Sequence, residues 1–319
     1  MLNAAHLNPT PSSPAPSRSF TCVINGSAGS HAAAAEKERL LELFNARGNR
    51  INVVLAEEGG QIPELVQRAI EEGSTVIIAA GGDGTVNAVA SVVLGSSATL
   101  GVLPLGTLNH FAKDLGVPTD LEAAVENLMT GRIVRVDVGK VNGKIFLNNS
   151  SLGLYPAIVR QREGYQKKGR GKWSAFAVAS FQALRRYQRL YVRLQLNNQP
   201  EIEEETPFVF IGNNQYEICG FRLGERKRVD TGKLWVYRAP HANRAALFRL
   251  AVNALCGKQE PGQLAFSDAE KFSIRTQKAF VHVATDGEVQ TMRGPLNYSI
   301  LPKVLSVIVP AKPGACEPG

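Results

Sequence analysis

The sequence has few cysteines and no long apolar run. Cys22, Cys219, Cys256 and Cys316 lie far apart and form no C-x-x-C pair. We therefore expect neither a zinc site nor a disulfide framework, and a reducing cytoplasm fits this pattern. No run approaches the ~18 apolar residues of a membrane span. No basic segment followed by an apolar one opens the chain, so we expect a protein that is not secreted.

Two common nucleotide-binding patterns are also missing. Neither G-x-x-x-x-G-K-[ST] nor G-x-G-x-x-G occurs, which argues against a P-loop and a dinucleotide-binding fingerprint. What the 319 residues do have is an excess of basic side chains, with a formal net charge of +8, alongside 44% hydrophobic and 20% charged residues. This composition is typical of a globular protein large enough for two domains. The positive charge suits an anionic partner, such as a nucleotide, a nucleic acid or an acidic membrane surface.

Residues 75–94 organise the chain, with the sequence TVIIAAGGDGTVNAVASVVL. Residues 75–80 predict a buried strand, and apolar residues from Val86 onward recur at helical spacing. We expect Thr85 to cap this helix and Gly95 to close it. The glycines between strand and helix would let phosphate approach the helix N-terminus. Asp83 indicates Mg²⁺ or an ordered water between its carboxylate and the phosphates. A plain Asp-Gly turn is the alternative.

Strands and helices alternate on either side of this segment. Apolar runs at residues 20–24, 51–55 and 99–103 are separated by helical patterns, which predicts a doubly wound parallel sheet. Glycine loops follow three of the strands, around Gly26, Gly82 and Gly106. Ligands of such sheets gather at the carboxyl ends of the strands. Three loops on that edge favour a nucleotide-binding site.

The pattern changes to short β-strands after residue 135. Residues 136–147, with Asn142-Gly143 in the middle, predict a β-hairpin. Further strands are expected at 190–196, 208–212, 234–237, 272–275, 280–284 and 296–309, with one helix at 244–255. We therefore expect a disordered Pro- and Ser-rich tail (1–18), an α/β domain (19–136) and a mostly antiparallel β-rich domain (137–302).

Residues 160–193 carry ten lysines and arginines against the single acid Glu163. Aromatic residues inside this segment keep helical spacing, which favours a basic amphipathic helix on an anionic membrane surface. A core-packed helix with a solvated basic face is the alternative. Nucleic acid is disfavoured, because no nucleic-acid-binding motif accompanies the charge. The candidate membrane or lipid contacts are Trp173, Phe176, Phe181, Arg185 and Arg186.

Several segments together resemble a known family. GGDGTVNAVAS and LPLGTLNHFAKDLGVP are similar to the catalytic domain of the diacylglycerol kinase and sphingosine kinase superfamily, in its soluble bacterial lipid-kinase branch. NGSAG, VDTGKL and TDGE resemble its first nucleotide loop, its metal-associated turn and its catalytic-base turn. The resemblance implies an ATP-binding α/β domain and a β-sandwich that carries the lipid site, with the active site in the cleft between them. It also implies that a last strand, at about 303–312, returns to the first domain.

The resemblance assigns roles by position. Asp286 would deprotonate the lipid hydroxyl, with Glu288 nearby, and Asp83 would join the Mg²⁺ and water network of the reaction. Asp230 lies in the turn that resembles the metal-associated one, which makes it a second metal candidate. Contacts to ATP would come from Asn25, Ser27, Gly81, Gly82, Gly84, Thr85, Gly106, Thr107 and Asn109.

Four positions depart from the family pattern. His110 stands where the family usually has Asp, Ala88 where it has Glu, and Gly26 where it has Pro. An Asx-Asp-Gly turn becomes Asp230-Thr231-Gly232, which weakens the case for a structural metal there. A histidine cannot replace a carboxylate beside Mg²⁺ one for one, but it can contact phosphate or a lipid head group. These departures argue for a subfamily in which the acceptor need not be diacylglycerol.

The sequence thus predicts an ATP- and Mg²⁺-dependent lipid kinase, peripheral to the inner membrane surface in the cytoplasm. Phosphoryl transfer mainly needs phosphates and Mg²⁺ held in place, an aligned hydroxyl and an acceptor for its proton. Two alternatives stay open: a kinase of a soluble substrate such as NAD, and a nucleotide-binding regulator without activity. The sequence does not fix the lipid, the number of metal ions or the oligomeric state, a homodimer included.

Overall fold

The computed structural model describes residues 18–26, 30–154, 156, 189–196, 200–216, 226–239, 246 and 264–311. Apart from Arg18, the expected tail lies outside these residues. The helix expected at 244–255 also lies outside them, apart from Ala246. Within the described residues, no helix is long and apolar enough to span a bilayer.

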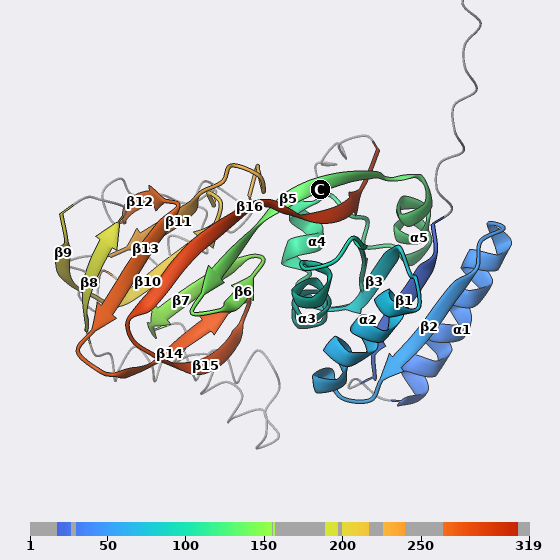
Figure 1. Ribbon diagram of the computed structural model, residues 1–319, viewed down its shortest axis with the longest axis horizontal. Helices are drawn as coiled ribbons and strands as arrows, with labels where there is room; N and C mark the ends of the chain where they lie inside the picture. The colour runs from blue at the N-terminus through green and yellow to red at the C-terminus, as the bar shows by residue number, and fades with distance from the viewer. Residues whose placement is uncertain are drawn as a thin grey trace, which may run out of the picture.

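The first domain is built on a parallel sheet (Figure 1). Its strands β1 (Phe20–Asn25), β2 (Ile51–Ala56), β3 (Val76–Gly81) and β4 (Thr99–Pro104) lie in the order β2-β1-β3-β4. All three pairings are parallel. β3 and β4 are buried along almost their whole length, as expected for strands covered on both faces.

Helices cover both faces of this sheet, which confirms the doubly wound fold. α1 (Ser30–Ala46) and α5 (Leu121–Thr130) bury Leu40, Phe44 and Leu128 against one face. α2 (Ile62–Glu71), α3 (Asp83–Val93) and the short α4 (His110–Asp114) pack on the other, around residues such as Val66 and Val89. A 3₁₀ turn (Gly59–Gln61) precedes α2.

The expected start of α3 was wrong by three residues. The helix begins at Asp83 and its N-cap is Gly82, so Thr85 lies inside the first turn and is buried there. Val86 N–H already donates to the carbonyl of Gly82 at 3.0 Å. The apolar spacing marks only the buried face, which first appears at Val86, and it does not show that the Asp-Gly pair is helical as well.

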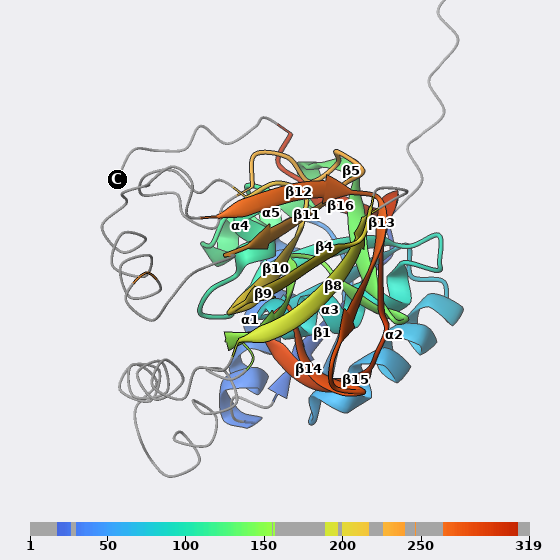
Figure 2. The same ribbon diagram turned by 90° about the vertical axis from the view of Figure 1, so that its left-hand side faces the viewer.

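The second domain is a sandwich of antiparallel sheets (Figure 2). One sheet has six strands in the order β12-β11-β10-β7-β14-β15. Their bounds are β7 (Asn149–Gly153), β10 (Phe208–Asn213), β11 (Leu234–Arg238), β12 (Ala265–Ala269), β14 (Phe280–Thr285) and β15 (Glu288–Arg293). Facing it are β8 (Leu190–Leu196), β9 (Ile202–Thr206), β13 (Lys271–Thr276) and the first part of β16 (Leu296–Val309). Leu194, Val236 and Val283 are fully buried in the core between them.

Two long strands run from one domain into the other. β5 (Arg132–Val141) and β16 pair antiparallel along both of their halves, and β6 (Lys144–Phe146) continues from β5. β16 pairs with β13 in the sandwich and, at Val307, with Leu100 of β4. Figure 1 shows both strands spanning the two domains. The backbone is thus hydrogen-bonded continuously from the parallel sheet to the sandwich.

β16 has a bulge at the point where it crosses from one domain to the other. The register against β5 shifts between Leu301 and Leu305, and Lys303 there has a φ of 51°. The buried carboxylate of Asp137, on β5, accepts the N–H of Lys303 at 2.8 Å and the N–H of Gly232 at 2.6 Å. One side chain therefore holds the bulge of β16 and the turn before β11.

The hairpin between β5 and β6 tests how a turn residue contributes to stability. Asn142 and Gly143 have φ values of 44° and 93°, the left-handed pair expected from the sequence. A Cβ on Gly143 would meet nothing within 4 Å, so Gly143→Ala tests backbone strain alone. We expect it to lower the free energy of unfolding by about 1–2 kcal/mol in denaturant titrations.

Gly95→Ala is the matched control for this substitution. Gly95 also faces open space, but its φ is not positive. We expect its effect to stay within about 0.5 kcal/mol. Equal stabilities for the two variants would contradict the explanation by strain.

Candidate active site

Three loops that follow parallel strands meet at one edge of the sheet. The loops after β3 and β4 touch through glycines: a Cβ built on Gly106 would lie 2.4 Å from the Cα of Gly82. Leu105 N–H also donates to the carbonyl of Gly81 at 3.2 Å. At the end of β1, the Asn25 amide donates to the Thr85 hydroxyl at 3.2 Å. Sequence reasoning placed these loops together, and the structure brings them into contact.

Asn109 shapes the loop in which it lies. Its side chain accepts the N–H of Gly106 at 3.0 Å and donates to the carbonyls of Pro104 and Gly106 at 3.1 and 2.8 Å. Its backbone is left-handed, with a φ of 51°. The amide is buried and used within its own loop, whereas Thr107 in the same loop is exposed.

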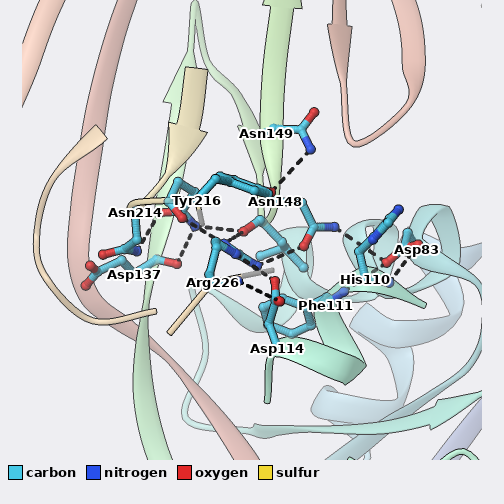
Figure 3. A network of polar contacts seen from close by, with 12 residues as sticks. Asp83, His110, Phe111, Asp114, Asp137, Asn148, Asn149, Asn214, Tyr216 and Arg226 are labelled. Atoms are coloured by element: carbon cyan, nitrogen blue, oxygen red, sulfur yellow. Dashed lines mark hydrogen bonds and ion pairs between the residues drawn. The ribbon is translucent and has the colours of Figure 1, made fainter. Parts of the chain in front are cut away.

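Asp83 joins the two helices at this edge. It is the first residue of α3, and its carboxylate accepts the N–H groups of His110 and Phe111 at 3.2 Å each, at the start of α4. The amide of Asn148 lies 3.5 Å from the same carboxylate. His110, which stands in place of the family's Asp, is exposed beside it (Figure 3). Asp83 therefore has a structural role as a helix cap, and it stays partly exposed.

Asp286 is the most completely hydrogen-bonded carboxylate described here. It lies at the tip of the β14–β15 hairpin with a φ of 48°. One oxygen accepts the N–H groups of Asn148 and Asn149 at 2.8 and 3.1 Å. The other accepts the N–H of Leu147 at 2.8 Å and the side-chain amide of Asn87, on α3, at 2.5 Å. The hairpin of the second domain is thus bonded to the glycine-loop helix of the first.

Burial raises the pKa of Asp286 above that of an exposed carboxyl. The backbone N–H groups of Leu147, Asn148 and Asn149 and the Asn87 amide act in the opposite direction, since they stabilise the charged form. Desolvation is the larger effect. A carboxylate whose pKa moves toward neutrality is a better proton acceptor near pH 7 than an exposed one.

Glu288 faces the same helix. A Cβ on Gly84 would lie 3.2 Å from its carboxylate oxygen, which places Glu288 over the first turn of α3. The side chain is exposed and 3.6 Å from the Lys144 ammonium. Glu288 and Asp286 therefore both lie next to α3, but Glu288 is exposed and Asp286 is half-buried.

Asp230 lies apart from these groups, in the turn before β11. Its carboxylate pairs with Arg228 at 3.0 Å and with Lys303 at 4.0 Å, and the Arg228 hydrogen bond lowers its pKa. Among the described residues, no group of three or more His, Cys, Asp or Glu side chains is arranged for a metal. With two cations on its carboxylate, Asp230 does not fit a metal ligand in this arrangement. Its metal role stays a prediction from the sequence.

Several predicted contacts lie outside the described residues. They are Ser27, Trp173, Phe176, Phe181, Arg185 and Arg186. Two other members of the basic segment, Arg189 and Arg193, are described, and they pair with Glu205 and Glu203 across β8 and β9. Acids that lie outside the segment in sequence therefore compensate part of its charge.

A buried arginine forms the centre of the network in Figure 3. Arg226 pairs with Asp114 at 2.7 Å, and the two side chains are 0% and 3% exposed. It also donates to the Asn148 side chain at 2.9 Å and to the carbonyls of Leu147 and Asn213, at 2.8 Å each.

Sequence reasoning missed Arg226, Asp114, Asn87 and Asn148. Arg226 lies in the run GERKRVD, where it looks no different from Arg228, whose side chain is 65% exposed. The Asn-Asn pair at 148–149, directly after an apolar strand, was a signal that could have been used. Asparagines at that place often hold turns by side-chain hydrogen bonds.

Comparisons with known proteins agree with this geometry. Residues 19–141 match the model of the diacylglycerol kinase catalytic domain. Residues 155–309 match the YegS C-terminal NAD kinase beta sandwich-like domain. The chain thus combines a diacylglycerol kinase catalytic domain with a YegS-type C-terminal domain. Over 222 residues, it is 27% identical to a diacylglycerol kinase of Staphylococcus saprophyticus, an alignment that covers 69% of this chain and 72% of the relative.

Two solved structures share the fold. A diacylglycerol kinase from Bacillus anthracis superposes with a TM-score of 0.66 at 20% identity, covering 92% of this chain and 97% of that one. An NAD kinase from Archaeoglobus fulgidus, solved in complex with ATP, superposes with a TM-score of 0.50 at 12% identity, covering 91% and 92%. At these identities the likeness shows the fold: an α/β domain joined to an antiparallel β-sandwich.

The contact between the two glycine loops can be tested by a pair of substitutions. Gly106→Ala brings a Cβ to 2.4 Å from Gly82, so the loops must separate. Gly82→Ala brings a Cβ to 3.4 Å from Gly106, which is an ordinary contact. We expect Gly106→Ala to lower the free energy of unfolding by about 1–3 kcal/mol and Gly82→Ala to change it by less than about 1 kcal/mol. Thermal unfolding measures both, and a larger loss for Gly82→Ala would contradict the loop contact.

Proposed function

We propose that this protein is an ATP-dependent lipid kinase, which transfers the γ-phosphate of ATP to a lipid hydroxyl. One observation carries the proposal: the hairpin tip with Asp286 and Glu288 lies against the first turn of α3, directly after the glycine loop. A proton acceptor and a candidate phosphate-binding loop, supplied by different domains, are thereby next to each other.

The glycine loops fit a nucleotide. Gly106 lies so close to Gly82 that it has no room for a side chain, so the two loops meet through backbone that a phosphate can approach closely. The N-terminus of α3 adds the positive end of a helix dipole. The A. fulgidus NAD kinase with the same fold was solved with ATP, which supports ATP as the donor.

Asp83 is the carboxylate placed best for Mg²⁺. It is partly exposed beside the glycine loops, and Mg²⁺ takes oxygen ligands, commonly one or two carboxylates together with phosphates and waters. When bound, the ion would offset the negative charge of the phosphates. Thr107 and His110, both exposed at the same edge, are positioned to contact phosphate or the acceptor.

Asp286 is the proposed proton acceptor. A carboxylate has about four lone-pair sites, and all of them are engaged by three backbone N–H groups and the Asn87 amide. Asn87 is the donor that can rotate away, since the other three are fixed in the chain. A substrate hydroxyl that takes the place of Asn87 would meet a base whose orientation the backbone already sets.

The apolar surface next to the glycine loops favours a lipid acceptor. Leu105 and Leu108, in the loop after β4, are 41% and 53% exposed. An acceptor with hydrocarbon chains could cover them, whereas a sugar or a nucleotide gains little there. The names of the relatives point the same way. Attachment to an anionic membrane surface rests on the basic segment at residues 160–193 and remains part of this proposal.

Radiolabelling tests the proposed function directly. The protein is incubated with γ-labelled ATP, Mg²⁺ and a total bacterial lipid extract, and in parallel with NAD and with hexose phosphates. We expect label in an organic-soluble phospholipid. Label only in NADP or a sugar phosphate would favour the kinase of a soluble substrate, and the absence of any product would favour the regulator.

The Asp286→Asn variant tests the proton acceptor. Asparagine tolerates the left-handed backbone at this tip, so the hairpin should form. It offers one acceptor oxygen in place of two, which costs about 1–3 kcal/mol of stability because a backbone donor is left unpaired. We expect kcat to fall by about 10²–10⁴-fold with a nearly unchanged KM for ATP, measured well below the melting temperature.

The pH dependence provides an independent check on the same residue. Asp286 must be ionised to accept a proton, and burial raises its pKa. Wild-type activity should therefore fall as the pH is lowered. This fall should begin at a higher pH than it would if the base were an exposed aspartate, whose pKa is about 3.9. The residual activity of Asp286→Asn should lack this limb. Near-wild-type turnover in the variant, or an unchanged limb, would show that another group is the base.

A further inference from the structure

Arg226 contacts several of the residues that surround the proposed site. Its side chain is fully buried and forms one ion pair and three further hydrogen bonds. The guanidinium also lies over the aromatic ring of Tyr216, 5.5 Å from the ring centroid. A guanidinium only donates hydrogen bonds, so each of these contacts fixes the orientation of the acceptor that it meets.

One group of contacts leads to Asp83. Asp114, the counter-ion of Arg226, is the last residue of α4, and it also accepts the backbone N–H of Arg226 at 3.2 Å. The other end of α4 supplies the two N–H groups that hold the carboxylate of Asp83. The ion pair therefore anchors the short helix that positions Asp83.

A second group leads to Asp286. Arg226 binds the carbonyl of Leu147 and the side-chain oxygen of Asn148. The backbone N–H groups of the same two residues hold the Asp286 carboxylate. Because the oxygen of the Asn148 side chain faces Arg226, its amide nitrogen is turned to Asp83, 3.5 Å away.

We propose that Arg226, with Asp114 as its counter-ion, is a positioning residue that sets Asp83 and Asp286 relative to each other across the two domains. This inference rests on the proposed kinase function. Arg226 contacts neither Asp83 nor Asp286 directly. It acts on Asp83 through α4, and on Asp286 through Leu147 and Asn148. A displacement of reacting groups by about 1 Å can cost about 10²-fold in rate.

Arg226→Lys is the decisive variant. Lysine keeps the positive charge beside Asp114, so no unpaired buried carboxylate is created. It cannot reach Leu147, Asn148, Asn213 and Asp114 together. We expect kcat to fall by about 10²-fold while KM for ATP stays within about a factor of two. Combining it with Asn148→Ala should cost little more than the stronger single substitution, because both break the same chain of contacts.

Arg238→Lys is the matched control. Arg238 also forms a buried ion pair in the second domain, with Glu204 at 3.0 Å, and the two side chains are 7% and 13% exposed. Its described hydrogen bonds go to Glu204 and Ser267, neither of which contacts Asp83 or Asp286. We expect this variant to lose stability to a similar extent and to keep the wild-type kcat.

Amide hydrogen exchange gives a readout that does not need activity. In Arg226→Lys, a peptide spanning residues 144–153 should exchange faster than in the wild-type protein, and in Arg238→Lys it should not. If Arg226→Lys has the exchange rates and the kcat of the wild-type protein, the positioning role is overturned and the proposed function stays intact. Equal losses of kcat in the two arginine variants would have the same meaning. No phosphorylated lipid from the wild-type protein would overturn both.

Discussion

A carboxylate that is removed from water must be surrounded by hydrogen-bond donors, and the arrangement of this molecule depends on that requirement at Asp286. Three of the donors are the backbone N–H groups of residues 147–149, which lead into β7, and the fourth comes from α3 in the other domain. The complete set of four bonds therefore requires contact between the two domains. The same four bonds make Asp286 well oriented and leave one replaceable partner.

The two aspartates of the proposed site, Asp83 and Asp286, have different surroundings. Asp83 and Asp286 are both half-buried, but Asp83 is held by two N–H groups of a short helix and Asp286 by four donors. A metal ion needs an accessible oxygen, and a base needs a raised pKa and a fixed direction. Under the proposed mechanism, this difference in surroundings would suit Asp83 to a metal ion and Asp286 to accepting a proton.

Much of the fold could be predicted because its signals are local. Apolar runs predicted the parallel strands. Asn142-Gly143 and Asp286-Gly287 predicted two hairpins, and the four residues have the positive φ values that such turns require. The strands β7 and β12, rich in Ser, Asn and Asp, were not expected, because they lack the β-branched and apolar pattern. Helix α5 was missed although Asp120 caps it by accepting the N–H of Ala123 at 2.9 Å.

The candidate site could be predicted only in part. Glycines and aspartates at strand ends are visible in a sequence, so the sequence could place Gly82, Asp83 and Gly106 at one edge of the sheet, where the structure has them. Arg226 lies 112 residues from Asp114 along the chain, and nothing local distinguishes a buried arginine from a solvated one. The sequence predicts that Asn109 contacts ATP, but in the structure the hydrogen bonds of its side chain go to residues of its own loop and the end of β4. Long-range partners and side-chain direction are properties of the folded chain.

The crossing of β16 has a consequence for how this protein can be divided. The strand that borders β4 comes from the far end of the chain, after the whole sandwich has been traversed. A fragment that stops at residue 141 would contain β1 to β4 but not β16, so β4 would have an open hydrogen-bonding edge. Uncovered edges of this kind recruit strands from other molecules. The α/β domain outlined in the sequence is therefore completed by a strand that follows the sandwich in the chain, and we expect that domain to be poorly soluble when it is expressed without the strand.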